Sequence, residues 1–144
     1  MLCVAGTQSY FDFCHIGWLY AHKASSYYLS KQQSIQLSWG TARLWCKKLG
    51  GHSDLVKIET KEENDYLSRI LTEVGNSHGW IGATDTAEEG TFRWVDGSLM
   101  GYSKWGRYEP NNAGGEHCVH LNFKGTWNDY PCGWLQHFIC ERKS

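Results

Sequence analysis

Residues 109–129 read EPNNAGGEHCVHLNFKGTWND, a stretch that joins a polar loop to a segment with apolar side chains. It opens with Glu109-Pro110-Asn111 and closes with Trp127-Asn128-Asp129. Pro110 is one of two prolines in the chain, and cis peptide bonds in proteins are found almost only before proline. A cis bond at this proline would turn two neighbouring side-chain oxygens toward one ion.

The loop that contains the first motif is long and rich in side-chain oxygens. Residues 97–117 include five glycines and two adjacent asparagines, and a loop of this length in a compact domain is usually functional. Singly, such residues are typical of turns, but together they match the oxygen ligands that calcium prefers. The candidate ligands are Glu109, Asn111, Asn112, Glu116, Asn128 and Asp129.

Two helices are predicted before this loop. Ser38 is a candidate N-cap, apolar residues recur at helical spacing from Trp39 to Leu49, and Gly50-Gly51 can end the helix. Thr60 and Glu63 match a capping box, which predicts that a second helix starts at Thr60. Its buried stripe is expected to contain Tyr66, Leu67, Ile70 and Leu71.

Short strands are expected after the helices. Residues 80–82 and 92–95 are typical of strands, and Asp96-Gly97 is typical of a turn. Further strands are predicted at 117–123 and 137–141. The predicted class is therefore α+β, with two early helices, short antiparallel strands late in the chain and a long loop between them.

Length and charge restrict the kind of protein. A chain of 144 residues suits one compact domain, and a formal net charge of −1 offers no basic surface for nucleic acid or anionic membranes. No apolar run approaches the roughly 20 residues that span a bilayer. We therefore expect no nucleic-acid partner and no membrane insertion.

Six cysteines indicate an oxidising compartment, so the chain is expected to be secreted and extracellular. A reduced zinc protein is the alternative, and the absence of any Cys-x-x-Cys pair disfavours it. Six cysteines allow 15 pairings, and the residues alone do not choose among them.

The order and spacing of the motifs resemble the C-type lectin domain family from about Ser26 to Lys143. The resemblance implies a C-type lectin fold at residues 26–144, preceded by an N-terminal segment at 1–25 that forms a hairpin in longer relatives. It also implies calcium-dependent carbohydrate binding. The matching features are Trp39…Ala42…Cys46, Trp80-Ile81-Gly82, Glu89-Gly90…Trp94, Glu109-Pro110-Asn111, Glu116-His117-Cys118, Trp127-Asn128-Asp129 and Cys132…Cys140.

The resemblance also implies disulfide pairings. Cys46 is expected to pair with Cys140, and Cys118 with Cys132. Cys3 and Cys14 have a separation that suits the N-terminal hairpin, but the expected strand at 27–29 begins well after Cys14. Either these two cysteines form a local bridge, or one or both link two chains.

Two calcium sites are implied by the resemblance. The primary ligands are Glu109, Asn111, Glu116, Asn128 and Asp129, with the Asp129 carbonyl as a further oxygen. An auxiliary site would use Asp85, Glu89, Asn112 and Glu116. Here the chain departs from the family, because His117 stands where many relatives have an acid, which removes one candidate ligand.

The expected ligand is a sugar with two adjacent hydroxyls that complete the shell of the ion. Glu109 would accept a hydrogen bond from one hydroxyl and Asn111 would donate one. In the family, this motif is associated with mannose, N-acetylglucosamine, fucose and glucose, whereas Gln-Pro-Asp is associated with galactose. A galactose-specific lectin is the alternative, with an aromatic platform supplied by Tyr102, Trp105, Tyr108 or Tyr130.

Two other classes of function compete with carbohydrate binding. A structural or mineral-interacting protein on the same fold is one alternative. An enzyme is disfavoured, because no nucleophile is paired with a base. The expected role is recognition of microbial or self glycans, as in innate immunity. Weak single sites favour a homodimer or larger assembly, since linked sites raise avidity.

Overall fold

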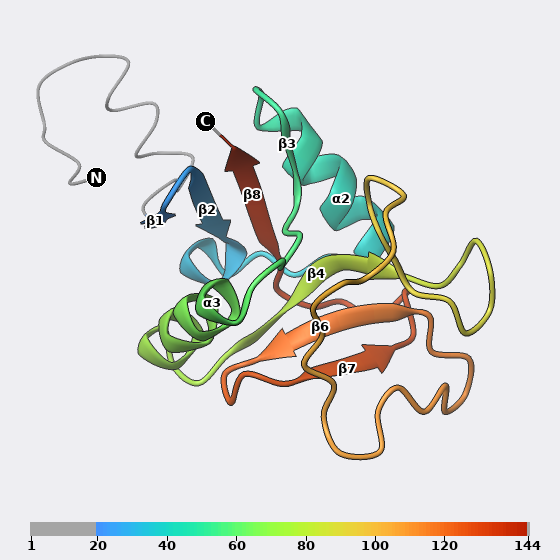
Figure 1. The fold of residues 1–144 in the computed structure, drawn as a ribbon. Coiled ribbons are helices and arrows are strands. Elements are labelled where there is room, and N and C mark those ends of the chain that lie inside the picture. Colours follow the sequence, from blue (N-terminus) through green and yellow to red (C-terminus); the bar gives the residue numbers. More distant parts are fainter. Residues whose placement is uncertain (1–19, 144) are drawn as a thin grey trace, which may run out of the picture.

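The computed structural model describes residues 20–143, which form two four-stranded sheets and two α-helices (Figure 1). The first sheet has the order β1-β2-β8-β3, with β1 at Tyr20–His22, β2 at Ser25–Leu29, β8 at Ile139–Lys143 and β3 at Ser53–Leu55. The second has the order β5-β4-β6-β7, with β5 at Arg93–Trp94, β4 at His78–Thr84, β6 at Cys118–Asn122 and β7 at Trp127–Tyr130. All neighbouring strands are antiparallel, which confirms the predicted α+β class.

The helical elements are η1 (Ser30–Gln33), a short 3-10 helix, α2 (Trp39–Lys48) and α3 (Lys61–Glu73). Figure 1 shows α2 beside β3 and α3 below β2, while the loop between β5 and β6 extends beyond β7. No helix within residues 20–143 has both the length and the apolar character needed to cross a membrane.

The first predicted helix is confirmed as α2. Ser38 occupies the N-cap position, but its hydroxyl donates to Thr41 Oγ1 at 3.0 Å instead of accepting from a backbone N–H. Ala42 and Cys46 are fully buried against the sheets. After the helix, Gly50-Gly51 adopts φ values of 87° and 63°, which glycine tolerates and which end the helix.

The second predicted helix is confirmed as α3, with half of the expected capping box. Thr60 Oγ1 accepts a hydrogen bond from Glu63 N at 3.1 Å, as predicted. The Glu63 carboxylate, however, accepts from Glu59 N at 2.9 Å instead of the N-cap N–H. Of the expected stripe, Leu67, Ile70 and Leu71 are buried and Tyr66 is partly buried.

Three short strands have no bounds predicted from the sequence. β3 and β1 have three residues each, and β7 coincides with the motif predicted only as a source of ligands. β1 extends the first sheet to residues before Ser26 by pairing with β2. The strand predicted at 137–141 lies at Ile139–Lys143, because it pairs with β2 and β3 together.

Two disulfides join distant segments. Cys46 pairs with Cys140, which ties α2 to β8, and Cys118 pairs with Cys132, which ties β6 to the segment after β7. Both pairings confirm the expectation. The predicted Cys3–Cys14 pair lies outside the described residues.

Trp127 connects the core to the polar loop. Its fully buried indole donates from Nε1 to Asn64 Oδ1 at 2.8 Å, and Asn64 Nδ2 donates to the Gly125 carbonyl at 2.8 Å. Asn64, on α3, thereby provides hydrogen-bond partners for Gly125 and Trp127, the two residues that flank Thr126. These bonds fix β7, the strand that carries Asn128-Asp129. The rings packed edge-on against this indole belong to Trp94, Tyr102 and Trp105.

Replacing Asn64 by alanine is expected to destabilise the fold by about 2–4 kcal/mol. The change leaves the Trp127 N–H and the Gly125 carbonyl buried without partners, and each such loss costs about 1–3 kcal/mol. Equilibrium unfolding in urea measures the free energy. Asp65→Ala, which breaks the exposed Lys61–Asp65 ion pair on the same helix, is the matched control and should change stability by less than ~0.5 kcal/mol. Equal effects of the two changes would contradict this role.

Candidate calcium-binding site

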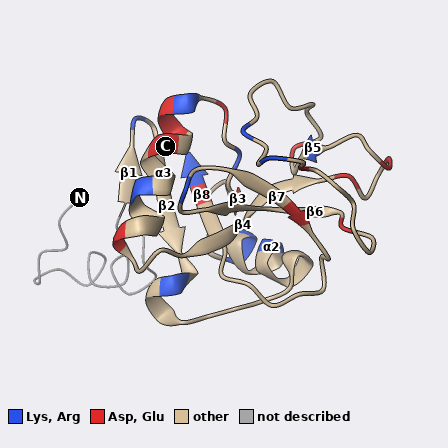
Figure 2. Ribbon diagram, turned by 90° about the horizontal axis from the view of Figure 1, so that it is seen from below, with Lys and Arg blue, Asp and Glu red and all other residues tan. Residues whose placement is uncertain are grey.

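Asp129 holds the polar loop against the second sheet. The residue is 2% exposed, and its carboxylate accepts two backbone hydrogen bonds, from Asn111 N to Oδ1 at 3.0 Å and from Asn112 N to Oδ2 at 2.8 Å. One strand residue therefore fixes the backbone of the loop at the two positions that follow Pro110. Figure 2 shows acidic segments on β7 and on the loops near β5 and β6.

Glu109 and Asn111 flank Pro110, and their side chains lie next to each other. The Glu109-Pro110 bond is cis. Asn111 Nδ2 donates to Glu109 Oε1 at 3.2 Å, and Asn111 Oδ1 accepts from Ala113 N at 3.0 Å. The two side chains thus present a carboxylate and an amide at neighbouring positions of one loop.

Gly106 allows Asn128 to approach Glu109. A Cβ atom at Gly106 would lie 2.9 Å from Asn128 Oδ1 and 3.6 Å from Glu109 Cγ. The Gly106 N–H donates to the Trp127 carbonyl at 2.9 Å, and its carbonyl accepts from Glu109 N at 3.0 Å. This glycine is therefore the point at which the strand motif and the loop motif meet.

Three carboxylates share this small volume. Burial, followed by interactions with Asp129 and Glu116, raises the pKa of Glu109 to about 7. Burial and the charge of Asp129 also raise the pKa of Glu116. Glu109 Oε2 is buried and has no hydrogen-bond partner among the residues that the structure describes. Like charges and an unpartnered carboxylate oxygen indicate a site that a cation would complete.

The structure therefore brings all five predicted primary residues together. Loop and strand contacts join Glu109, Asn111, Asn128 and Asp129, and Glu116 interacts electrostatically with the same cluster. The donor set consists of carboxylate and amide oxygens, which fit calcium. When bound, calcium would supply the positive charge that offsets these carboxylates and would offer coordination positions to ligand oxygens.

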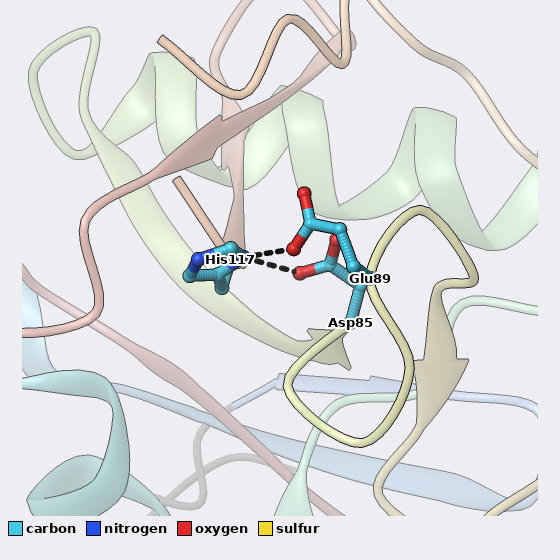
Figure 3. Close-up of side chains that lie close together, drawn as sticks. All are labelled: Asp85, Glu89 and His117. Carbon is cyan, nitrogen blue, oxygen red and sulfur yellow. Dashed lines mark hydrogen bonds and ion pairs between the residues drawn. The ribbon is translucent and has the colours of Figure 1, made fainter. Parts of the chain in front are cut away.

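Two of the predicted auxiliary residues, Asp85 and Glu89, form a second cluster with His117, and the carboxylate of Glu116 is not part of it (Figure 3). His117 Nδ1 lies 2.9 Å from Asp85 Oδ1 and 3.1 Å from Glu89 Oε2. Asn112 Nδ2 donates to Glu89 Oε1 at 2.6 Å, while its Oδ1 accepts from Glu116 N at 3.0 Å. The side chain of His117 thus lies among the auxiliary residues, with its nitrogen beside both acids.

The four aromatic residues considered as platforms have different environments. Tyr102 and Trp105 pack against Trp127 and belong to the core. Tyr108 is 79% exposed, directly precedes Glu109 and lies under the Arg107 guanidinium, whose Cζ is 4.9 Å from the ring centroid. Tyr130 is partly buried against the second core cluster. Tyr108 and Tyr130 are therefore the two candidates whose positions suit ligand contact.

Sequence reasoning missed two residues that position the site. Asn64 could have been suspected, because an asparagine inside an amphipathic helix is unfavourable unless its side chain has a specific partner. Gly106 carries no such signal. Its requirement arises only from the approach of Asn128 in three dimensions.

Gly106→Ala is expected to weaken calcium binding by roughly tenfold, the scale seen when groups that position metal ligands are altered. The added Cβ would displace the Asn128 carboxamide or the loop beside Glu109. Calcium titration monitored by calorimetry measures the affinity, and circular dichroism checks the fold. Gly101→Ala is the control, because nothing lies within 4 Å of a Cβ there. Unchanged calcium affinity in Gly106→Ala would contradict the proposed geometry.

Comparison with known proteins places the chain in a family. Residues 35–142 match the Lectin C-type domain model. The chain is 37% identical over 135 residues to human C-type lectin domain family 17, member A, covering 90% of this chain and 32% of that protein. It is 38% identical over 109 residues to a lectin of Pleurodeles waltl, covering 72% of this chain and 63% of that protein. It therefore spans less than two thirds of either relative.

Solved structures agree with this match. The human scavenger receptor C-type lectin carbohydrate-recognition domain superposes with a TM-score of 0.80 at 32% identity, covering 87% of this chain and 95% of that one. The cow CD23 carbohydrate-recognition domain has a TM-score of 0.76 at 36% identity, covering 89% and 94% of the two chains. Domains of this family bind carbohydrate and are not enzymes, which agrees with the predicted absence of catalysis. The chain belongs to the C-type lectin domain family.

Proposed function

We propose that this chain binds sugars through a calcium ion held by Glu109, Asn111, Glu116, Asn128 and Asp129. The observation that carries the proposal is the unpartnered, buried Oε2 of Glu109 beside two further carboxylates. A protein would not gain stability from crowding these charges without a cation. Their oxygen chemistry and placement on one loop and one strand support calcium as that cation.

The sugar would bind through two adjacent hydroxyls. Each hydroxyl would place an oxygen on the ion, donate to a carboxylate and accept from an amide. Glu109 and Asn111 supply one such acceptor and donor, and Glu116 and Asn128 supply the other pair. This direction of hydrogen bonding suits the equatorial hydroxyls of mannose-type sugars, which include mannose, N-acetylglucosamine and fucose. In support, the cow CD23 structure was determined in the presence of a GlcNAc2Man3 oligosaccharide.

The auxiliary cluster would bind calcium more weakly than the primary site. Asp85 and Glu89 offer carboxylate oxygens, but His117 contributes a nitrogen, which calcium does not prefer, and the amide oxygen of Asn112 accepts from Glu116 N. The hydrogen bond from Asn112 to Glu89 links this cluster to the loop held by Asp129. A weakly bound second ion would therefore stiffen the same loop.

We infer an extracellular setting and a multivalent protein. The Cys46–Cys140 and Cys118–Cys132 disulfides suit an oxidising compartment. A site that holds two hydroxyls on an open loop gives weak single binding, and linking sites raises avidity by about 10²–10⁴. A homodimer or larger assembly would therefore make glycan recognition useful, and innate recognition of microbial surfaces is the role that we favour.

Asn128→Ala tests the function. The variant should lose calcium-dependent sugar binding while the fold persists, since Asn128 is partly exposed and lies outside the core. Retention on immobilised mannose, followed by elution with a chelator, is the measurement. Ser103→Ala, on the exposed neighbouring loop, should bind as the native chain does. If the native protein is retained on neither a mannose nor a galactose column, the structural or mineral-interacting alternative is favoured.

Sugar binding should weaken as the pH falls from 7 to about 5. Calcium needs ionised carboxylates, and the pKa of Glu109, raised to about 7, means that protons already compete for this group near neutrality. Burial and the charge of Asp129 raise the pKa of Glu116 as well. Binding measured at several pH values should recover in acid when calcium is raised, because the competition follows mass action. Flat binding between these limits, or failure to recover, would be inconsistent with this competition.

Exchanging the loop motif should change the preferred sugar. Glu109→Gln combined with Asn111→Asp swaps donor and acceptor, yet keeps an oxygen at each position and the same summed charge. Calcium binding should survive while the preference moves from mannose or N-acetylglucosamine toward galactose. Competition with monosaccharides, measured on the native chain and on the double variant, shows which sugar each one prefers. A native preference for galactose would instead favour stacking on Tyr108 or Tyr130 over the hydrogen-bond pattern.

A further inference from the structure

Two carboxylates and one imidazole converge where the loop after β4 meets the residue that precedes β6 (Figure 3). They belong to Asp85, Glu89 and His117, and one ligand atom from each lies within 4.8 Å of the other two. Within residues 20–143, no other three side chains of histidine, cysteine, aspartate or glutamate converge so closely. The primary calcium site proposed above uses none of these three side chains.

Backbone hydrogen bonds fix Asp85 and His117 against each other. The His117 carbonyl accepts from Asp85 N at 3.1 Å and from the Thr84 hydroxyl at 2.7 Å. Gly90 N donates to Asp85 Oδ2 at 2.9 Å, which folds the loop that carries Glu89 back onto Asp85. The main chain therefore brings the three ligand atoms together before any ion binds, as a metal site requires.

The two carboxylates share a single imidazole nitrogen. His117 Nδ1 lies 2.9 Å from Asp85 Oδ1 and 3.1 Å from Glu89 Oε2. A ring nitrogen carries at most one N–H, which can point well at only one of these oxygens, and the ring carries at most one positive charge. The Asp85 side chain is 2% exposed, so water has little access to its carboxylate. A dication would bind both carboxylates at once and balance both charges.

The types of ligand atom select the class of metal ion. Calcium and magnesium prefer sets made of oxygens alone, whereas an imidazole nitrogen with carboxylate oxygens suits zinc and similar transition metals. Tetrahedral zinc, with bonds of about 2.0–2.2 Å, separates its ligand atoms by roughly 3.3–3.5 Å. The nitrogen–oxygen distances of 2.9 and 3.1 Å therefore need to open by only a few tenths of an ångström.

We propose that Asp85, Glu89 and His117 bind a divalent transition-metal ion of the zinc class, with water in the fourth position. The neutral imidazole would bind through Nδ1 and keep its proton on Nε2. The side chains of Glu89 and His117 are 58% and 33% exposed, so the ion has access from solvent. The site does not depend on sugar binding, although the hydrogen bond from Asn112 Nδ2 to Glu89 Oε1 connects it to the calcium loop.

Zinc titration by calorimetry, in calcium that saturates the oxygen-rich primary site, tests the proposal. The native chain should bind one zinc ion. His117→Asp, which supplies the acid that many relatives have here, should weaken zinc binding by at least about tenfold and strengthen the binding of a second calcium ion. Glu89→Gln keeps an oxygen for Asn112 but removes the charge, and it should weaken zinc binding by a similar factor. Circular dichroism checks that each variant is folded.

His78→Ala is the matched control, because this exposed histidine at the start of β4 has its ring centroid 4.9 Å from that of His120 and offers zinc another pair of imidazoles. His78→Ala should keep the native zinc affinity. Asn128→Ala, which removes a proposed ligand of the primary calcium site, should keep it as well.

Native protein that takes up no zinc overturns the proposal, and so does equal zinc affinity in the native chain and His117→Asp. Loss of zinc in His78→Ala alone would place the ion at the imidazole pair, and loss in Asn128→Ala alone would place it on the calcium loop. Either result overturns the assignment to Asp85, Glu89 and His117. Native protein that binds zinc here but no sugar in calcium would contradict the proposed function and support this site.

Discussion

The pair of backbone hydrogen bonds accepted by Asp129 is the constraint on which the site depends. The carboxylate is almost fully buried, and its two oxygens hold Asn111 N and Asn112 N. It lies on β7, two positions after the indole that Asn64 fixes to α3. The rigid core thereby determines where a glycine-rich loop places its carboxylate and amide groups.

The same constraint creates an electrostatic conflict. Holding the loop against β7 brings Glu109 and Glu116 close to Asp129, and burial together with these charges raises the pKa of Glu109 to about 7. A cation resolves the conflict, because it replaces repulsion between carboxylates by attraction to a shared charge. The fold therefore holds the carboxylates close together, and the ion makes this arrangement of the carboxylates favourable.

Much of this arrangement could be predicted from the sequence, because long helices and dense motifs carry periodic or chemical signals. The starts of α2 and α3 follow from Ser38 and Thr60, and the five residues predicted as primary ligands lie in one cluster. Strands of three or four residues, such as β3, are too short to show alternation and were missed. The need for glycine at position 106 depends on a contact with Asn128, which no local pattern records. The sequence shows that His117 stands where many relatives have an acid at the auxiliary site. The contact of its ring nitrogen with both Asp85 and Glu89 arises only in the folded chain.

Proton release on calcium binding shows whether crowded carboxylates hold the ion. Glu109 has a pKa of about 7 without calcium and must be ionised to hold the ion, so binding near neutral pH should expel protons. Calorimetry in buffers with different ionisation enthalpies measures that release. The account predicts a release that grows as the pH is lowered from 8 to 6 and that shrinks in Glu109→Gln, which cannot titrate. Calcium binding without proton release, or equal release from the native chain and Glu109→Gln, would contradict the claim that crowded carboxylates form the site.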